Sequence, residues 1–201
     1  MANARGAPIE ITSPVRLVLI TGNPGGWKTV VSKVLGCRLP EPWEVVHLDH
    51  FLYLKTVDTG DFWNDVEASA GIRAAAIKFY CDRGGRVIYE GIIQTDREVD
   101  AYCRAANVVR DSAEFRFFDL RCAREEAIRR MRRRPLKESE TFPFGQQYDG
   151  LTRRLGATGA TIINTNEKTP ERVVEEIIGL INFTQDGSRS NPGRQVGDRQ
   201  R

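Results

Sequence analysis

Residues 15–29 read VRLVLITGNPGGWKT, and this stretch decides the fold. Val15–Thr21 is a short, almost continuous apolar run rich in β-branched residues, which is typical of a buried strand. The glycine and proline cluster after it predicts a tight loop. Lys28–Leu35 has apolar residues at helical spacing, and Gly36 is expected to end that helix. The sequence therefore predicts a strand, a loop and a helix in immediate succession.

The loop follows the phosphate-binding pattern G-x-x-x-x-G-K-[ST] at all but one of its fixed positions. Backbone N–H groups of such a loop converge on phosphate oxygens, and the positive end of the following helix adds to the attraction. The pattern predicts that Lys28 lies along the β- and γ-phosphates of ATP and that the Thr29 hydroxyl holds Mg²⁺. The alternative is a plain strand–helix turn with a surface lysine. The predicted nucleotide-binding residues are Gly22, Asn23, Pro24, Gly25, Gly26, Trp27, Lys28, Thr29 and Val30.

Trp27 stands where the pattern has glycine. Glycine suits that position because the backbone approaches phosphate closely there, often at positive φ. A non-glycine residue at positive φ costs about 1–2 kcal/mol. Two interpretations are open. Either the indole points away while Gly25 and Gly26 adopt the unusual dihedral angles, or the loop is damaged and binds nucleotide weakly.

Further apolar segments alternate with helical patterns along the chain. The predicted strands cover Trp43–Leu48, Val87–Tyr89, Phe115–Leu120 and Thr161–Asn164. The predicted helices cover Asp61–Asp82 (buried stripe Val66, Ile72, Ala76, Phe79), Thr95–Ala106 with an N-cap and acidic first turn, Arg124–Arg134, and a last helix opened by Thr169-Pro170-Glu171. Short apolar strands that alternate with helices predict an α/β fold with a mostly parallel five-stranded sheet. Ligands bind such a sheet at the carboxyl ends of its strands.

Two of the predicted strands end on acids. Asp49 follows the second strand, where a carboxylate could accept a proton from a substrate hydroxyl or only cap the strand end. Glu90 ends the third strand, where an acid could hold a magnesium-bound water, bind acceptor hydroxyls or serve the structure. His47 alternates with apolar residues and is expected to pack. Neighbours on a strand point to opposite faces, so His47, Asp49 and His50 are not expected to form a metal site.

The strongest charge run is the arginine-rich segment Arg129–Arg134. Arg130 and Arg134 are four residues apart on the predicted helix and therefore share a face. Their guanidinium groups could clamp a transferring phosphate. The same run could instead be a solvated basic face paired with Glu125 and Glu126, or a nucleic-acid patch.

The composition is that of an ordinary globular protein, with 201 residues, 40% hydrophobic and 28% charged. The net charge of +3 is mildly basic, and binding of an anionic substrate would suffice to explain it. Nucleic-acid binding is not required. No C-x-x-C pair occurs among the four cysteines, which we expect to be reduced thiols. No apolar run approaches a membrane span and the N-terminus lacks a signal-peptide core, so we expect a cytoplasmic protein without a membrane partner.

The order of these motifs resembles a known family. The phosphate loop, Asp49, Glu90, the arginine-rich helix and the closing Thr161–Ile181 segment resemble the small P-loop kinases of the chloramphenicol phosphotransferase, zeta-toxin and gluconate/shikimate kinase group. The phrase Leu39-Pro40-Glu41-Pro42-Trp43 is most similar to chloramphenicol phosphotransferase, and Asp49–Phe51 with Tyr89-Glu90-Gly91 also resembles the uridine kinase group.

The resemblance implies a three-layer P-loop NTPase fold of the nucleoside-monophosphate-kinase type with an arginine-rich lid. We expect an extension over residues 1–13, a kinase-like domain over 14–184 with a lid at about 121–150, and a disordered tail over 185–201, the last because the composition from about Gln185 turns to Asp, Gly, Ser, Asn, Pro, Gln and Arg. The resemblance also implies MgATP-dependent phosphorylation of a hydroxyl, with Lys28 and Thr29 at the nucleotide, Asp49 as base, and Arg130 and Arg134 as the lid clamp.

Three functions compete at this stage. The first is a small-molecule kinase with ATP and Mg²⁺ as cofactors and a hydroxyl compound as acceptor. The second is a degenerate nucleotide-binding module without turnover, which Trp27 favours. The third is a polynucleotide or toxin-type kinase, which stronger basic charge outside the lid would favour. Monomer and homodimer both stay open.

Overall fold

The five strands of the computed structural model form one parallel sheet in the order β2-β3-β1-β4-β5. The structure describes residues 14–40, 43–47, 66–133 and 158–183. The strands are β1 (Leu17–Gly22), β2 (Trp43–His47), β3 (Arg86–Glu90), β4 (Phe115–Arg121) and β5 (Thr161–Asn164). The helices are α1 (Lys28–Arg38), α3 (Val66–Cys81), α4 (Asp96–Ala106), α5 (Arg124–Arg132) and α7 (Pro170–Phe183). The predicted α/β class, the five strands and their parallel arrangement are confirmed.

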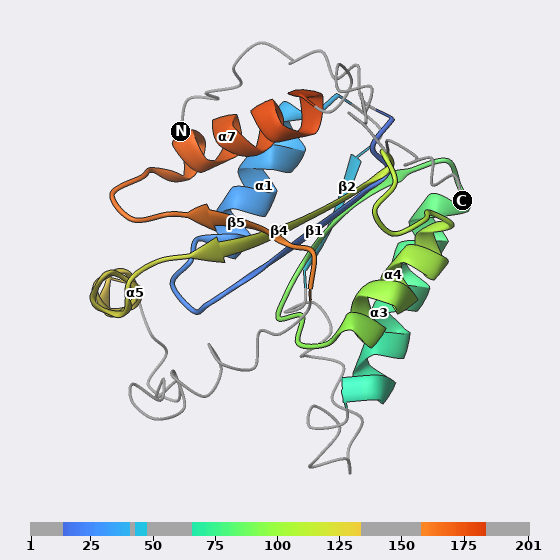
Figure 1. Cartoon of the computed structure of the whole chain (residues 1–201), viewed down its shortest axis with the longest axis horizontal. Coiled ribbons are helices and arrows are strands. Elements are labelled where there is room, and N and C mark those ends of the chain that lie inside the picture. Colours follow the sequence, from blue (N-terminus) through green and yellow to red (C-terminus); the bar gives the residue numbers. More distant parts are fainter. Residues whose placement is uncertain (1–13, 41–42, 48–65, 134–157, 184–201) are drawn as a thin grey trace, which may run out of the picture.

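The fold has three layers. Helices α1 and α7 cover one face of the sheet, α3 and α4 cover the other, and α5 lies beyond the end of β4 (Figure 1). Successive residues of a strand point to opposite faces, so the sheet contributes side chains to two hydrophobic cores, one on each face. In β1, Val18 and Ile20 belong to the core under α1 and α7, while Leu17 and Leu19 belong to the core under α3 and α4.

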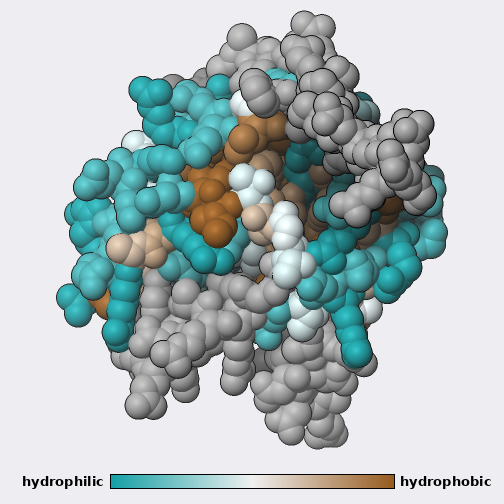
Figure 2. Space-filling view, viewed as in Figure 1, coloured by the Kyte–Doolittle hydropathy of each residue, from teal (hydrophilic) through white to brown (hydrophobic). Residues whose placement is uncertain are grey.

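Strand β5 forms one edge of the sheet, and its outer side is partly apolar. Ile162 is 58% exposed there. Figure 2 shows apolar surface gathered over this edge, with polar side chains around it. No helix in the described part of the chain is both long and apolar enough to cross a membrane.

Two details differ from the sequence predictions. Helix α1 continues through Gly36 to Arg38, and a side chain at Gly36 would collide with Val45 of β2. That glycine therefore lets the helix pack closely on the sheet and does not end it. The buried stripe of α3 is Ala70, Arg73, Ile77 and Cys81.

The predicted stripe of α3 was only partly right: Ala76 is half-buried and packs against the core under α3 and α4. Ile72 and Phe79 are 38% and 51% exposed, and the side chain of Val66 lies outside the described residues. Arg73 is buried in the core, which the sequence did not predict. A charged side chain is buried only where the fold supplies partners for it.

Those partners come from β3 and α4. Arg73 Nη2 donates to Glu98 Oε1 over 3.2 Å, and Arg73 Nη1 donates to the Tyr89 hydroxyl over 3.2 Å. Burial raises the pKa of Tyr89 to about 12, so its hydroxyl stays neutral. Glu98 also completes a capping box with Thr95, as the predicted N-cap required. One buried carboxylate thus joins α3, α4 and the loop that enters α4.

Arg73→Met should lower the free energy of unfolding by about 3 kcal/mol, because it leaves the Glu98 carboxylate buried without its guanidinium partner. Lys78→Met on the same helix removes the exposed pair Lys78–Asp82 and should cost less than about 1 kcal/mol. Urea denaturation of both variants measures the difference. Equal losses would show that the Arg73–Glu98 pair is no stronger than a surface ion pair.

Candidate active site

The phosphate loop joins the carboxyl end of β1 to the first turn of α1 (Figure 1). Within it, the Gly26 N–H donates to the Asn23 carbonyl over 3.0 Å. Lys28 Nζ donates to the carbonyls of Gly22 and Asn23 over 3.0 and 3.3 Å. The lysine therefore curls back over the loop, the position from which an ammonium group can reach a phosphate lying in the loop.

Asn23 fastens the loop to the end of β4. Its side-chain Nδ2 donates to the Cys122 carbonyl over 2.9 Å, and the Cys122 N–H donates to Asn23 Oδ1 over 3.3 Å. The Asn23 side chain is buried by this pairing. Of the predicted nucleotide-binding residues, Asn23 can therefore offer its backbone to a ligand, while its side chain holds the loop in place.

Trp27 itself adopts the left-handed conformation, with φ 69° and ψ 8°. Gly25 has φ 76°, whereas Gly26 has no positive φ. The interpretation that Gly25 and Gly26 adopt the unusual angles in place of Trp27 was therefore right for Gly25 and wrong for Gly26 and Trp27. A bulky residue keeps such a conformation only when its surroundings fix it. Here the indole packs against the core under α1 and α7 and against Arg130, whose Cζ lies 4.7 Å from the ring centroid.

Arg130 of α5 ties the loop to the neighbouring elements. It is 7% exposed. Its Nη1 donates to the Gly25 carbonyl over 3.1 Å and to the Thr165 hydroxyl over 3.1 Å, and its Nη2 donates to the Thr165 carbonyl. Its Nε donates to Glu126 over 2.6 Å. Its assignment as a phosphate clamp stays a prediction, and in this conformation the guanidinium binds protein atoms. Arg134, its predicted companion, lies outside the described residues.

Glu126 balances this cluster of arginines. Partial desolvation acts to raise the pKa of its carboxyl, but hydrogen bonds from Arg129 and Arg130 outweigh that effect and hold the pKa below its usual range. Glu126 therefore stays ionised beside Arg130. The pairing with Glu126 was one of the interpretations open for the arginine run.

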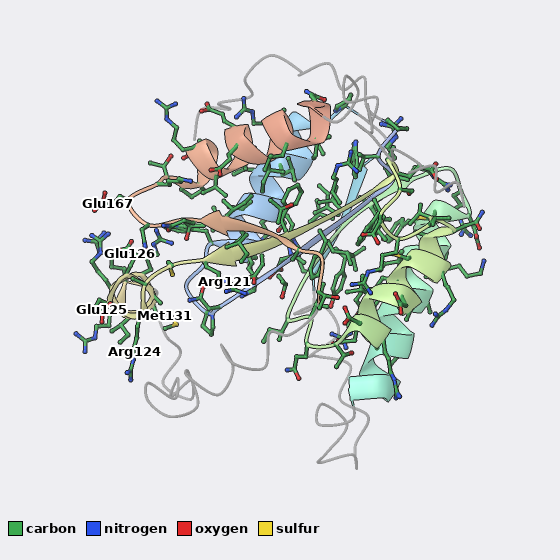
Figure 3. The ribbon with its side chains drawn as sticks, viewed as in Figure 1. Arg121, Arg124, Glu125, Glu126, Met131 and Glu167 are labelled. Carbon is green, nitrogen blue, oxygen red and sulfur yellow. The ribbon has the colours of Figure 1, made fainter. Side chains whose placement is uncertain are left out.

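A cavity of about 670 Å³ opens beside the loop. This size is typical of a pocket for a small molecule or cofactor. Glu126 of α5 and Glu167, which follows β5, lie at the same side of the molecule (Figure 3) and both line it. The full lining is Gly25, Trp27, Val30, Glu126, Arg129, Arg130, Arg133, Glu167, Lys168, Thr169, Pro170 and Glu171. Three predicted nucleotide-binding residues thus meet at the cavity, from which the loop leads to Lys28.

On the side of the loop nearer β2, Glu90 reaches Thr29. The Thr29 hydroxyl donates to Glu90 Oε1 over 3.3 Å, and Glu90 Oε2 lies 2.9 Å from His47 Nδ1. The two predicted metal ligands are therefore brought together. Asp49, the predicted base, lies outside the described residues.

His47 was expected only to pack, and its contact with Glu90 was not predicted. The missing information was the strand register, since β2 and β3 pair with His47 directly opposite Glu90. Residues paired across neighbouring strands point to the same face. Aligning the ends of the two predicted strands would instead have placed Asp49 opposite Glu90, so the contact of the imidazole with the carboxylate needed the observed register.

The donor set suits Mg²⁺. The ion prefers oxygen ligands and commonly takes only one or two from protein, the rest being water and substrate phosphates. Thr29 Oγ1 and Glu90 Oε1 are such oxygens, and they lie beside the loop that matches the phosphate-binding pattern. In the described part of the chain no three His, Cys, Asp or Glu residues form a metal cluster.

No protein-family model and no curated protein matches the chain. Solved structures with a similar fold include a sugar kinase from Janibacter sp. (16% identity, 85% of this chain and 96% of that chain, TM-score 0.60). A second is the tunicamycin resistance protein of Deinococcus radiodurans (19% identity, 83% of this chain and 94% of that chain, TM-score 0.59). A third is shikimate kinase from Acinetobacter baumannii in complex with shikimate (18% identity, 86% of this chain and 96% of that chain, TM-score 0.53). The resemblance to small P-loop kinases is thus confirmed at the level of the fold.

The left-handed conformation of Trp27 can be tested through stability. Trp27→Gly and Trp27→Ala both remove the indole, but only glycine adopts this conformation without strain. We expect the glycine variant to be more stable than the alanine variant by about 1 kcal/mol, measured by urea denaturation. An alanine variant as stable as the glycine variant would show that position 27 is not held at positive φ.

Proposed function

We propose that the chain is an ATP-dependent kinase that transfers the γ-phosphate to a hydroxyl of a small-molecule acceptor. The observation that carries the proposal is the pairing of Thr29 with Glu90 directly beside the phosphate loop. A lysine poised over the loop supports it, as does a ligand-sized cavity next to Trp27. The fold is shared with structures described as a sugar kinase and a shikimate kinase, which favours a hydroxyl acceptor here.

The nucleotide would lie along the loop. Its phosphates would bind the loop N–H groups and Lys28, whose ammonium would exchange the Gly22 and Asn23 carbonyls for phosphate oxygens. The nucleoside would occupy the cavity between α5 and the start of α7. The loop thus separates the nucleoside at one end from Thr29 and Glu90 at the other.

Thr29 and Glu90 would hold Mg²⁺, which supplies charge neutralisation to the phosphates when bound. Asp49 follows β2 by two residues, and we assign it the role of general base that accepts the proton of the acceptor hydroxyl. For Arg130 and Arg134 we retain the role of clamping the transferred phosphate. Arg130 would then leave the Gly25 carbonyl and turn toward the γ-phosphate.

One alternative has its own observation. The strained backbone at Trp27 and the engagement of Arg130 with the loop also fit a degenerate module that binds nucleotide without turnover. The two functions share the nucleotide site and differ only in phosphoryl transfer. A titration with a non-hydrolysable ATP analogue tests nucleotide binding. An assay of phosphate transfer to a panel of sugars and cyclic polyols tests turnover.

Lys28→Ala should weaken binding of MgATP analogue about 100-fold, because a charge-assisted hydrogen bond to phosphate contributes up to about 3 kcal/mol. Isothermal titration calorimetry measures the affinity. Lys33→Ala is the matched control, since Lys33 lies on the same helix and is exposed. Unchanged affinity in the Lys28 variant would refute the assignment of the phosphate loop.

Asp49→Asn should leave the affinity for the ATP analogue intact and lower the rate of phosphoryl transfer by about 100-fold or more, the scale of losing a general base. The assay follows transfer from radiolabelled ATP to the acceptor found in the panel. A variant with full activity would remove Asp49 from the mechanism. A wild-type protein that binds nucleotide and transfers phosphate to no compound would favour the module without turnover.

A further inference from the structure

We propose that His47 is a positioning residue of the magnesium site, which holds the Glu90 carboxylate in the orientation that faces Thr29. The inference rests on the proposed function and adds a residue that neither the phosphate-loop pattern nor the acids at the strand ends point to.

The His47–Glu90 pair is buried and geometrically fixed. Both residues are 4% exposed. They are partners in the parallel pairing of β2 with β3, so the backbone sets the separation of the two side chains. His47 Nδ1 and Glu90 Oε2 lie 2.9 Å apart, a good hydrogen-bonding distance. A carboxylate only accepts hydrogen bonds, so we assign the Nδ1 proton to His47 as donor.

This contact matters because it engages only one of the two carboxylate oxygens. Oε2 faces His47, which leaves Oε1 for Thr29. The Thr29–Glu90 contact is long, at 3.3 Å, and is too weak to fix the carboxylate alone. A glutamate has three rotatable bonds, so without His47 the group would sample other orientations. His47 therefore presents Oε1 to the place where the ion would lie.

Such outer partners of metal-binding groups orient their ligands, and their loss typically lowers metal affinity about 10–100-fold. The competing explanation is that the pair only stabilises the fold, as Arg73 and Glu98 do on the opposite face of the sheet. The two explanations differ in one measurable quantity. A positioning role changes how strongly Mg²⁺ promotes nucleotide binding, whereas a purely structural role changes only stability.

The experiment compares His47→Leu, His47→Asn and His47→Gln with the wild-type protein. Asparagine places an amide N–H near the position of Nδ1, glutamine places it about one bond too far, and leucine offers no donor. The affinity for a non-hydrolysable ATP analogue is measured by calorimetry with Mg²⁺ and with EDTA, and the ratio of the two affinities is the readout. Thermal unfolding of each variant is recorded in parallel.

We expect the affinity ratio to fall about 10-fold or more in the leucine and glutamine variants and to stay within about 3-fold of wild type in the asparagine variant. Binding in EDTA should be the same in all four proteins. Arg73→Lys is the matched control, because it weakens a buried ion pair away from the loop and should lower stability without changing the ratio. If His47→Leu does not fold, the contrast between asparagine and glutamine decides alone.

An affinity ratio in the leucine or glutamine variant equal to that of wild type would overturn the positioning role while leaving the nucleotide site intact. A ratio that falls equally in the asparagine variant would also overturn it. A wild-type protein that binds the analogue equally with and without Mg²⁺ would refute the magnesium site itself. Absence of binding in both conditions would refute the proposed function as well.

Discussion

The site depends on the position of β1 at the centre of the sheet. This strand pairs in parallel with β3 on one side and β4 on the other, so three strand ends meet at one edge. The loop after β1 is then held between the end of β4, through Asn23 and Cys122, and the end of β3, through Glu90. A parallel sheet makes such convergence automatic, because every carboxyl end points the same way. Moving β1 to an edge would leave the loop with support on one side only.

The loop carries a strained residue, and contacts around it offset the strain. A left-handed tryptophan costs about 1–2 kcal/mol in backbone energy. Packing of the half-buried indole on the core and its contact with Arg130 contribute in the opposite direction, the cation–π contact by about 0.5–2 kcal/mol. The buried indole N–H has no hydrogen-bond partner among the described residues, which adds a cost. Arg130 in turn bonds the Gly25 carbonyl, so the residue that packs on Trp27 also fixes the loop. Trp27 therefore lines the cavity together with Gly25 and Arg130, to which it is linked by these contacts. This arrangement gives a structural reason for an indole at a position where the pattern has glycine.

Most of the fold could be predicted from the sequence, because its strands are short apolar runs and its helix starts carry local signals such as the Thr95 cap. The features that could not be predicted depend on contacts between elements. The phase of α3 depends on Arg73 finding Glu98 across the core. The continuation of α1 through Gly36 depends on how closely the helix lies on β2. In the site, the phosphate-loop pattern and the end of β3 pointed to Thr29 and Glu90 as magnesium-binding residues, whereas the contact of His47 with Glu90 depends on the strand register.

Two of the buried acids, Glu98 and Glu90, differ in what their surroundings explain. Glu98 accepts hydrogen bonds from Arg73, from the Thr95 hydroxyl and from two backbone N–H groups, so its burial serves the start of α4. Among the described residues, Glu90 has only His47 and Thr29 as donors, and it caps no helix. A buried carboxylate is costly to desolvate, and replacing such a pair by apolar residues is often neutral or stabilising. Stability therefore explains Glu98 but gives little reason for Glu90. The magnesium site that we propose, with a cation between Glu90, Thr29 and phosphate, would supply that reason.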